Sequence, residues 1–166
     1  MAQQNKTEFG LINTYYSILK TEAPQILDSY MLYVEKNRKR RDRFYEPRRK
    51  TLKLVTDKLQ MLEDDELDEL FVHMPARVGK SQELTPATSW KCARNTEASN
   101  LYVTYKEGLG GAFIEGVIEI WTDPIYCFSD VFPKAIIVDT DAKNNKVDLQ
   151  RKKKYSCYFL KNALQF

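Results

Sequence analysis

The feature that most restricts the fold of this chain is the octet Met74–Ser81, which ends in Gly79, Lys80 and Ser81. A glycine here lets backbone N–H groups turn toward an anion, a lysine reaches the β- and γ-phosphates of a nucleotide, and a hydroxyl ligates Mg²⁺. Gly79, Lys80 and Ser81 provide the glycine, the lysine and the hydroxyl in that order. The first position, usually a second glycine, is Met74. The octet therefore predicts a phosphate-binding loop (a P-loop, or Walker A motif) of deviant form.

The residues on either side of the octet predict a strand before it and a helix after it. Leu70–Met74 is a short, mostly apolar run of the kind that a buried parallel strand needs, and Pro75 ends it. Residues 80–93 are expected to be helical, with a kink or interruption at Pro86, which lacks an N–H donor. An ordinary strand-to-helix turn with a surface lysine is the alternative interpretation. The order of strand, turn and helix favours the phosphate-binding one.

Apolar spacing predicts the other elements. Four further helices are expected, over Phe9–Lys20, Ala23–Asn37, Pro47–Leu62 and Gly108–Trp121. Runs rich in β-branched and aromatic residues predict further strands at Asn100–Tyr105, Ala135–Val138 and Tyr155–Leu160.

The charge of the chain is segregated along the sequence, although the net charge is only +3 over 166 residues. Residues 36–43, 48–50 and 151–154 are basic, and residues 63–69 are acidic. The basic blocks predict contact with nucleic acid phosphates, with solvated helix ends as the alternative. No apolar run approaches membrane-spanning length and the N-terminus lacks the hydrophobic region of a secretory signal, so we expect a cytoplasmic protein without a membrane segment.

Several short motifs occur together in one order. They are Phe44-Tyr45-x-Pro47-Arg48-Arg49, Met74-Pro75-x-Arg77-x-Gly79-Lys80-Ser81, Trp90 with Arg94-Asn95, Asn100–Tyr105, and Val131-Phe132-Pro133. In this combination the chain resembles, from about Tyr33 onward, the N-terminal ATPase part of the large terminase subunit of tailed bacteriophages. That subunit is the motor that packages DNA into a capsid.

The resemblance implies an α/β fold: a partial P-loop NTPase core of the additional-strand type, preceded by N-terminal helices. Residues 1–43 are then a helical lead-in with a basic junction, and residues 44–166 an incomplete P-loop ATPase domain. The sequence stops at Phe166, and we expect the family's catalytic acidic strand and nuclease domain to be missing. Asp64 and Asp65 precede the loop, and Asp139 and Asp141 follow a weak strand, so neither pair fits the acidic strand end. We therefore expect a truncated subunit, and the sequence leaves open whether it hydrolyses ATP.

The resemblance also implies a set of site residues, with ATP and Mg²⁺ as cofactors. Lys80 and Arg77 take catalytic roles, with Arg77 sensing the γ-phosphate, and Ser81 binds the metal. Nucleotide-binding positions are Pro75, Ala76, Arg77, Val78, Gly79, Lys80 and Ser81, together with an adenine-contacting segment formed by Phe44, Tyr45 and Arg48. A surface arginine is the alternative for Arg77, and a hydrophobic staple onto the next helix is the alternative for Phe44 and Tyr45.

The partners implied by the resemblance are those of a packaging motor in a bacterial host cell. They are double-stranded DNA, the portal and the small terminase subunit, and the family allows a homo-oligomer. Two rivals have other partners. One is a non-enzymatic DNA-binding or adaptor protein that uses residues 36–43, with Gly79-Lys80-Ser81 incidental. The other is a small nucleotide kinase, whose arginine lid and second acidic strand end we do not find.

Overall fold

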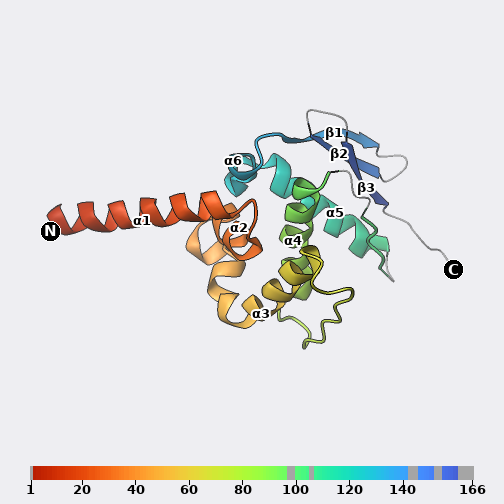
Figure 1. The fold of residues 1–166 in the computed structure, drawn as a ribbon, viewed down its shortest axis with the longest axis horizontal. Coiled ribbons are helices and arrows are strands. Elements are labelled where there is room, and N and C mark those ends of the chain that lie inside the picture. The colour runs from red at the N-terminus through yellow and green to blue at the C-terminus, as the bar shows by residue number, and fades with distance from the viewer. Residues whose placement is uncertain (1, 97–99, 105–106, 142–145, 152–154, 161–166) are drawn as a thin grey trace.

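The protein is a group of helices with a small sheet at one side (Figure 1). The computed structural model describes residues 2–96, 100–104, 107–141, 146–151 and 155–160, with side chains over 10–96, 100–104 and 109–135. In chain order the elements are α1 (Ala2–Glu22), α2 (Leu27–Val34), the 3₁₀ helix η1 (Arg40–Asp42), α3 (Tyr45–Glu63), α4 (Lys80–Arg94), α5 (Glu107–Thr122), η2 (Pro124–Tyr126), α6 (Phe128–Val131), β1 (Ala135–Asp141), β2 (Lys146–Arg151) and β3 (Tyr155–Leu160).

Helix α2 lies at the centre of the helical body. Seven of its eight residues are buried, as expected for a helix that is apolar nearly all round. The end of α1, α3, α4, α5 and α6 pack around it and share one hydrophobic core. The largest fully buried side chains of that core are Trp90, Tyr30, Tyr45, Leu27 and Met31. The N-terminal part of α1 projects away from this body (Figure 1).

Helices α4 and α5 approach each other closely at Gly116. A Cβ at that position would lie 3.1 Å from Thr85 Cγ2, so the glycine allows the two backbones to come together. Further along the same interface, Trp121 Nε1 donates to Ser89 Oγ (2.9 Å), and Ser89 also bonds the buried Tyr30 hydroxyl (2.9 Å). The buried polar groups at this contact are therefore paired, as a close-packed interior requires.

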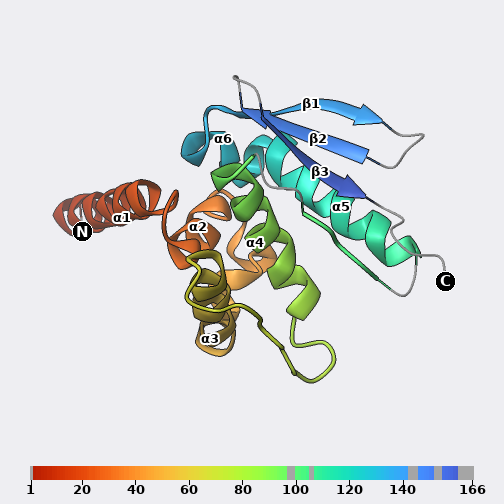
Figure 2. The same ribbon diagram turned by 45° about the vertical axis from the view of Figure 1, so that its right-hand side comes forward.

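The three strands form an antiparallel sheet in the order β1-β2-β3. The β1–β2 register shifts between Ile137 and Asp139. In both views the sheet lies on the side of α5 and α6, opposite α3 (Figures 1 and 2). β3 matches the predicted strand Tyr155–Leu160, and β1 extends three residues beyond the predicted strand Ala135–Val138. β2 was not predicted.

The expected α/β architecture is wrong. Residues 70–75 have no regular secondary structure, and Phe71 and Val72 are 79% and 37% exposed, so the apolar run before the loop is not a buried parallel strand. Asn100–Thr104 is also irregular, and Tyr105 lies outside the described residues. The helices pack on one another instead of on a parallel sheet, because α2 and α4 present their apolar residues to each other and to α5. The partial P-loop NTPase core is therefore not formed in this structure.

All five expected helices are confirmed. Their ends differ by up to four residues, except that α1 begins seven residues before Phe9. Helix α4 is continuous from Lys80 to Arg94, so of the kink or interruption expected at Pro86, the interruption is wrong. Gln82, whose carbonyl would have bonded the missing N–H, is exposed, and water can therefore satisfy it. Among the described residues, no helix combines the length and apolar character needed to cross a membrane.

Candidate phosphate-binding loop

The octet forms a loop that closes on itself at the start of α4. Residues 76–77 make a turn, residues 78–79 bend, and the helix begins at Lys80. The Lys80 ammonium donates a hydrogen bond to the carbonyl oxygen of Met74, at 3.1 Å. This bond joins the first and seventh positions of the octet, so the chain curls around an exposed cation.

Two residues with left-handed backbone conformation shape the loop. Arg77 has φ of 66° and Gly79 has φ of 112°. Only glycine adopts this region without steric cost, so Arg77 must be held there by the rest of the loop. Met74 and Val78, both half-buried, pack against the main core and anchor the loop on either side of Arg77. Pro75, Ala76 and Arg77 are left exposed at the tip.

Glycine is needed at position 79 because a side chain there would have no room, as well as because φ is positive. A Cβ built there would lie 2.6 Å from Phe44 Cζ and 2.8 Å from Phe44 Cε2. The ring of Phe44 therefore lies directly against the backbone at the start of α4. Any side chain at position 79 would displace this ring or the helix end.

The start of α4 offers unpaired backbone donors. Its first internal hydrogen bond runs from the Glu83 N–H to the Gly79 carbonyl (2.9 Å), so the N–H groups of Lys80, Ser81 and Gln82 precede the helical ladder. Gly79, in the N-cap position, has no side chain to accept from them. Ser81 is exposed, and its hydroxyl has no hydrogen-bond partner within the described part of the chain. A helix N-terminus with free N–H groups attracts anions.

The predicted adenine-contacting segment is only partly brought to the loop. Phe44 touches Gly79, and the Arg48 guanidinium lies 5.1 Å from the centre of the Phe44 ring while donating to the Phe44 carbonyl (3.1 Å). Tyr45 instead points into the core, where it is fully buried and donates to Asp28 Oδ1 (2.6 Å). Tyr45 has no exposed face on which a base could stack. The helix begins at Tyr45, two residues before Pro47, and Phe44 packs on the loop.

Sequence reasoning missed Glu35, which fixes the position of Phe44. Its carboxylate accepts from the backbone N–H groups of Phe44 (2.9 Å) and Tyr45 (3.0 Å), and it also accepts from Arg38 (3.4 Å). The carboxylate therefore caps the N-terminus of α3. No local pattern could have shown this, because the cap comes from the end of α2, nine residues before Phe44, and a capping box places its acid inside the helix.

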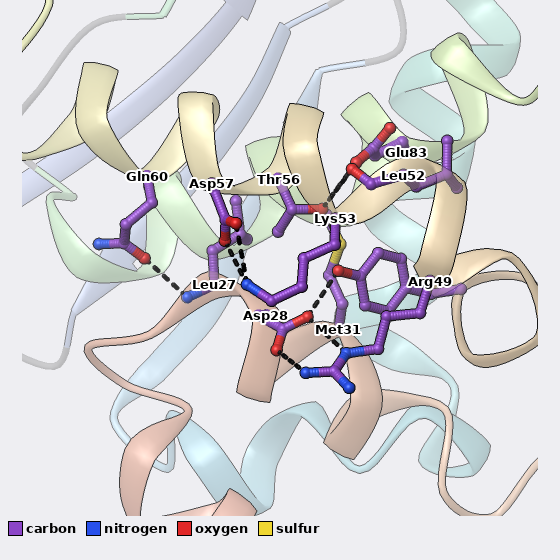
Figure 3. Close-up of polar contacts among 11 residues, drawn as sticks. Leu27, Asp28, Met31, Arg49, Leu52, Lys53, Thr56, Asp57, Gln60 and Glu83 are labelled. Carbon is purple, nitrogen blue, oxygen red and sulfur yellow. Dashed lines mark hydrogen bonds and ion pairs between the residues drawn. The ribbon is translucent and has the colours of Figure 1, made fainter.

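A second missed residue, Glu83, lies buried one turn after the loop. Its Oε1 accepts from Thr56 Oγ1 on α3 (2.7 Å), while its Oε2 is buried without a hydrogen-bond partner (Figure 3). Burial raises the pKa of Glu83, and the Thr56 hydrogen bond opposes this rise only in part. A glutamate in the first turn of a helix usually faces solvent, so the sequence alone gave no sign of its burial.

The adjacent α2–α3 contact shows a fully paired carboxylate (Figure 3). Asp28 accepts from Arg49 Nη2 (2.6 Å) and Nε (3.0 Å) as well as from Tyr45. Burial alone would raise the pKa of Asp28, but the hydrogen bonds from Arg49 and Tyr45 outweigh it, and the pKa is lowered. Burial, with the hydrogen bond to Asp28 acting in the same direction, raises the pKa of Tyr45. This pairing holds the start of α3, and with it Phe44, against α2.

A pocket of about 300 Å³ adjoins the loop. Phe44 forms part of its wall, with Gln82 and Thr85 from α4, Glu35 and Arg38 from the segment that follows α2, and Tyr126. The Arg38 guanidinium lies 5.0 Å from the centre of the Tyr126 ring. Phe44 therefore contributes both to this pocket and to the support of Gly79.

Comparison with known proteins returns no match, whether against family models, curated proteins or solved structures. The site must therefore be interpreted from its own chemistry. No cluster of three or more His, Cys, Asp or Glu side chains that could hold a metal occurs among the described residues. For Mg²⁺ the loop offers the Ser81 hydroxyl, and a bound polyphosphate and water would supply the remaining oxygen ligands that this ion prefers.

Proposed function

We propose that the loop of residues 75–81 binds the phosphates of ATP together with Mg²⁺, and that the chain is the nucleotide-binding portion of a DNA-packaging motor of the terminase kind. The observation that supports this best is the closed octet: Lys80 returns to the Met74 carbonyl across a loop that ends in left-handed Gly79 and an uncapped helix. The terminase assignment itself rests on the sequence resemblance.

Each loop residue has a definite task in this proposal. The N–H groups of Lys80, Ser81 and Gln82 donate to phosphate oxygens, and the Lys80 ammonium exchanges the Met74 carbonyl for the β- and γ-phosphates. The Ser81 hydroxyl ligates Mg²⁺. Arg77, exposed at the loop tip, contacts the terminal phosphate with its fixed charge. This arrangement needs only the loop and the start of α4, and it does not require a parallel sheet.

The base is held differently from the sequence expectation. Because Tyr45 is buried, the planar groups left beside the loop are Phe44 and the exposed Arg48 guanidinium that lies over it. Guanidinium planes stack on aromatic rings, so we assign the base contact to Arg48.

Binding is expected to exceed turnover by a wide margin. Phosphoryl transfer needs carboxylates that hold the metal and orient the attacking water. The carboxylate closest in sequence to the loop on α4 is Glu83, which is buried and bonded to Thr56. We therefore propose nucleotide binding as the activity of this chain. Double-stranded DNA, the portal and the small terminase subunit are the proposed partners, in the cytoplasm of a bacterial host.

The decisive experiment is a calorimetric titration of Mg-ATP into the parent protein and Lys80→Ala. Charge-assisted hydrogen bonds contribute about 1.5–3 kcal/mol each, so Lys80→Ala should weaken binding by roughly 10- to 100-fold. Lys50→Ala is the matched control, because Lys50 is an exposed lysine of α3 that takes no part in the loop. Equal affinity of the parent and Lys80→Ala would refute the phosphate-binding assignment.

A further inference from the structure

The structure divides the basic segment 36–50 into two kinds of cation. Four of its side chains are paired with carboxylates that stabilise the fold: Lys36 with Asp130 (3.1 Å), Arg38 with Glu35 (3.4 Å), Arg43 with Glu46 (2.5 Å) and Arg49 with Asp28 (2.6 Å). Arg43 is further fixed by donating to the Lys36 and Arg38 carbonyls. The charge of these four is therefore already matched within the fold, although half-exposed pairs of this kind contribute only up to about 1 kcal/mol each.

The remaining cations of the segment are exposed. They are Lys39, Arg40, Arg41, Arg48 and Lys50. The 3₁₀ helix η1, which carries Arg40 and Arg41, has no buried residue. Arg41 is 79% exposed and its one carboxylate contact, to Asp42, is long at 3.6 Å. Within the described residues, Lys39 and Arg40 make no ion pair. Their charge is therefore available to a partner.

Several of these cations line one cleft. A concave surface of about 820 Å³ is bounded by Arg40, Arg41, Arg43, Glu46, Pro47 and Arg48. Four arginines face one carboxylate there, and that carboxylate is already held by Arg43. The cleft is consequently a site of concentrated positive charge. Arg48 also covers the Phe44 ring, which supports Gly79 of the candidate loop. The cleft and the loop are therefore adjacent through Arg48 and Phe44.

We propose that this cleft binds the phosphate backbone of double-stranded DNA, with Arg40 and Arg41 as the contacting residues. Guanidinium groups bind phosphate oxygens through two donors at once. A protein partner would need a buried aromatic or aliphatic anchor, and the one apolar residue of the cleft is Pro47. Single-stranded nucleic acid would need an aromatic platform, which the lining residues lack. The contacts reach phosphates and no base edge, so binding is independent of base sequence.

This inference deepens the proposed function by naming the surface that holds DNA, and it rests on that function for the choice of duplex. The test measures the binding of a short fluorescein-labelled DNA duplex by anisotropy, without nucleotide, between about 50 and 200 mM salt. The variant is Arg40→Ala/Arg41→Ala. The matched control is Lys20→Ala/Lys134→Ala, which removes the same charge from exposed positions on α1 and after α6. Circular dichroism verifies that both variants are folded.

The double arginine variant should lose roughly 10- to 100-fold in duplex affinity at about 0.1 M salt, and its salt slope should fall by about 2, as expected for two lost phosphate contacts. The lysine control should bind the duplex with the affinity of the parent protein. The parent should also bind a duplex of unrelated sequence with the same affinity. Lys80→Ala should also retain duplex affinity, which separates this proposal from the nucleotide-binding one.

Three outcomes would overturn the assignment. Equal losses in the arginine variant and the lysine control would show that only net charge matters. Tighter binding to phosphatidylserine vesicles than to the duplex would assign the cleft to a membrane surface. Displacement of the duplex by poly-glutamate at equal charge concentration would assign it to an acidic protein.

Discussion

The connector between α3 and α4 (residues 64–79) is held very differently from the packing contact of α2, α3 and α4. At the helix contact, polar side chains find partners distant in sequence: the Trp90 indole donates to the Ala23 carbonyl (2.8 Å), and Gln60 accepts from the Leu27 N–H (2.8 Å) (Figure 3). The connector runs along the surface as an extended coil (Figures 1 and 2), and its large apolar side chains Phe71 and Val72 are exposed.

The difference teaches where the candidate site gets its shape. Within the described residues, the connector packs on the main core at Met74 and Val78, next to α4, and its first residue, Asp64, pairs with Arg94 (3.3 Å). The loop is therefore positioned by α4 and by Phe44, and both of these are fixed by the helix contact. A phosphate-binding motif usually follows a buried strand. Here its position is set by packed helices instead.

The largest expected effect is a difference in stability loss, when an apolar side chain is removed from the helix contact and when one is removed from the connector. Trp90→Ala should lower the free energy of unfolding by about 3–5 kcal/mol, because it leaves a large cavity and an unpaired buried carbonyl at Ala23. Phe71→Ala should change it by less than about 0.5 kcal/mol, since an exposed side chain buries little surface. Urea denaturation measures both. Similar losses in the two variants would show that the connector is packed.

An intermediate effect is expected at Gly79, where the two regions meet. Gly79→Ala should destabilise by about 1–3 kcal/mol, because alanine is strained at positive φ and its Cβ meets the Phe44 ring. It should also weaken Mg-ATP binding. The control is Gly10→Ala on α1, where a Cβ meets nothing within 4 Å and should stabilise by about 0.5–1 kcal/mol. A neutral Gly79→Ala in urea denaturation would contradict the close approach of Phe44.

The smallest effect concerns the buried carboxyl of Glu83 and is visible in its pH dependence. Since the folded-state pKa is raised, the stability from this group is full below its usual value of 4.5 and is lost as pH rises through the folded value. Glu83→Gln should therefore raise the free energy of unfolding at pH 7 by about 1–2 kcal/mol, because the neutral amide avoids the cost of burying a charge, and by less in acid.

Urea denaturation at both pH values tests this expectation. Glu69→Gln, which removes an exposed carboxylate of the connector, should give differences below about 0.5 kcal/mol throughout. A Glu83→Gln difference that does not change with pH would show that Glu83 keeps its charge without penalty.

The sequence predicted the helices because their apolar residues recur at intervals that one helical face requires, as Leu52 and Leu59 do on α3. It failed at Leu70–Met74, since an apolar run of this length suits a buried strand and says nothing about whether a neighbouring strand exists. Here the apolar faces of α2, α4 and α5 satisfy one another. Tertiary packing, which no local pattern encodes, decided the architecture.

The candidate site was predictable to a similar degree. Gly79, Lys80 and Ser81 follow from the chemistry of phosphate binding, and Phe44 and Arg48 lie beside them. The burial of Tyr45 and the capping by Glu35 depend on how α3 is placed against α2, through Asp28 and Arg49. Such contacts join residues that are nine or more positions apart, so sequence spacing could not reveal them.

The exposed connector has a consequence for the integrity of the molecule. A protease that cut at Phe71 would sever the chain where little holds it, yet Trp90 would still bond Ala23 and Lys91 would still pair with Glu63 (2.5 Å) across the break. The two fragments should stay together as a nicked complex. Phe44 would come from one fragment and the loop from the other, so the candidate site is one that two separately made pieces could reconstitute.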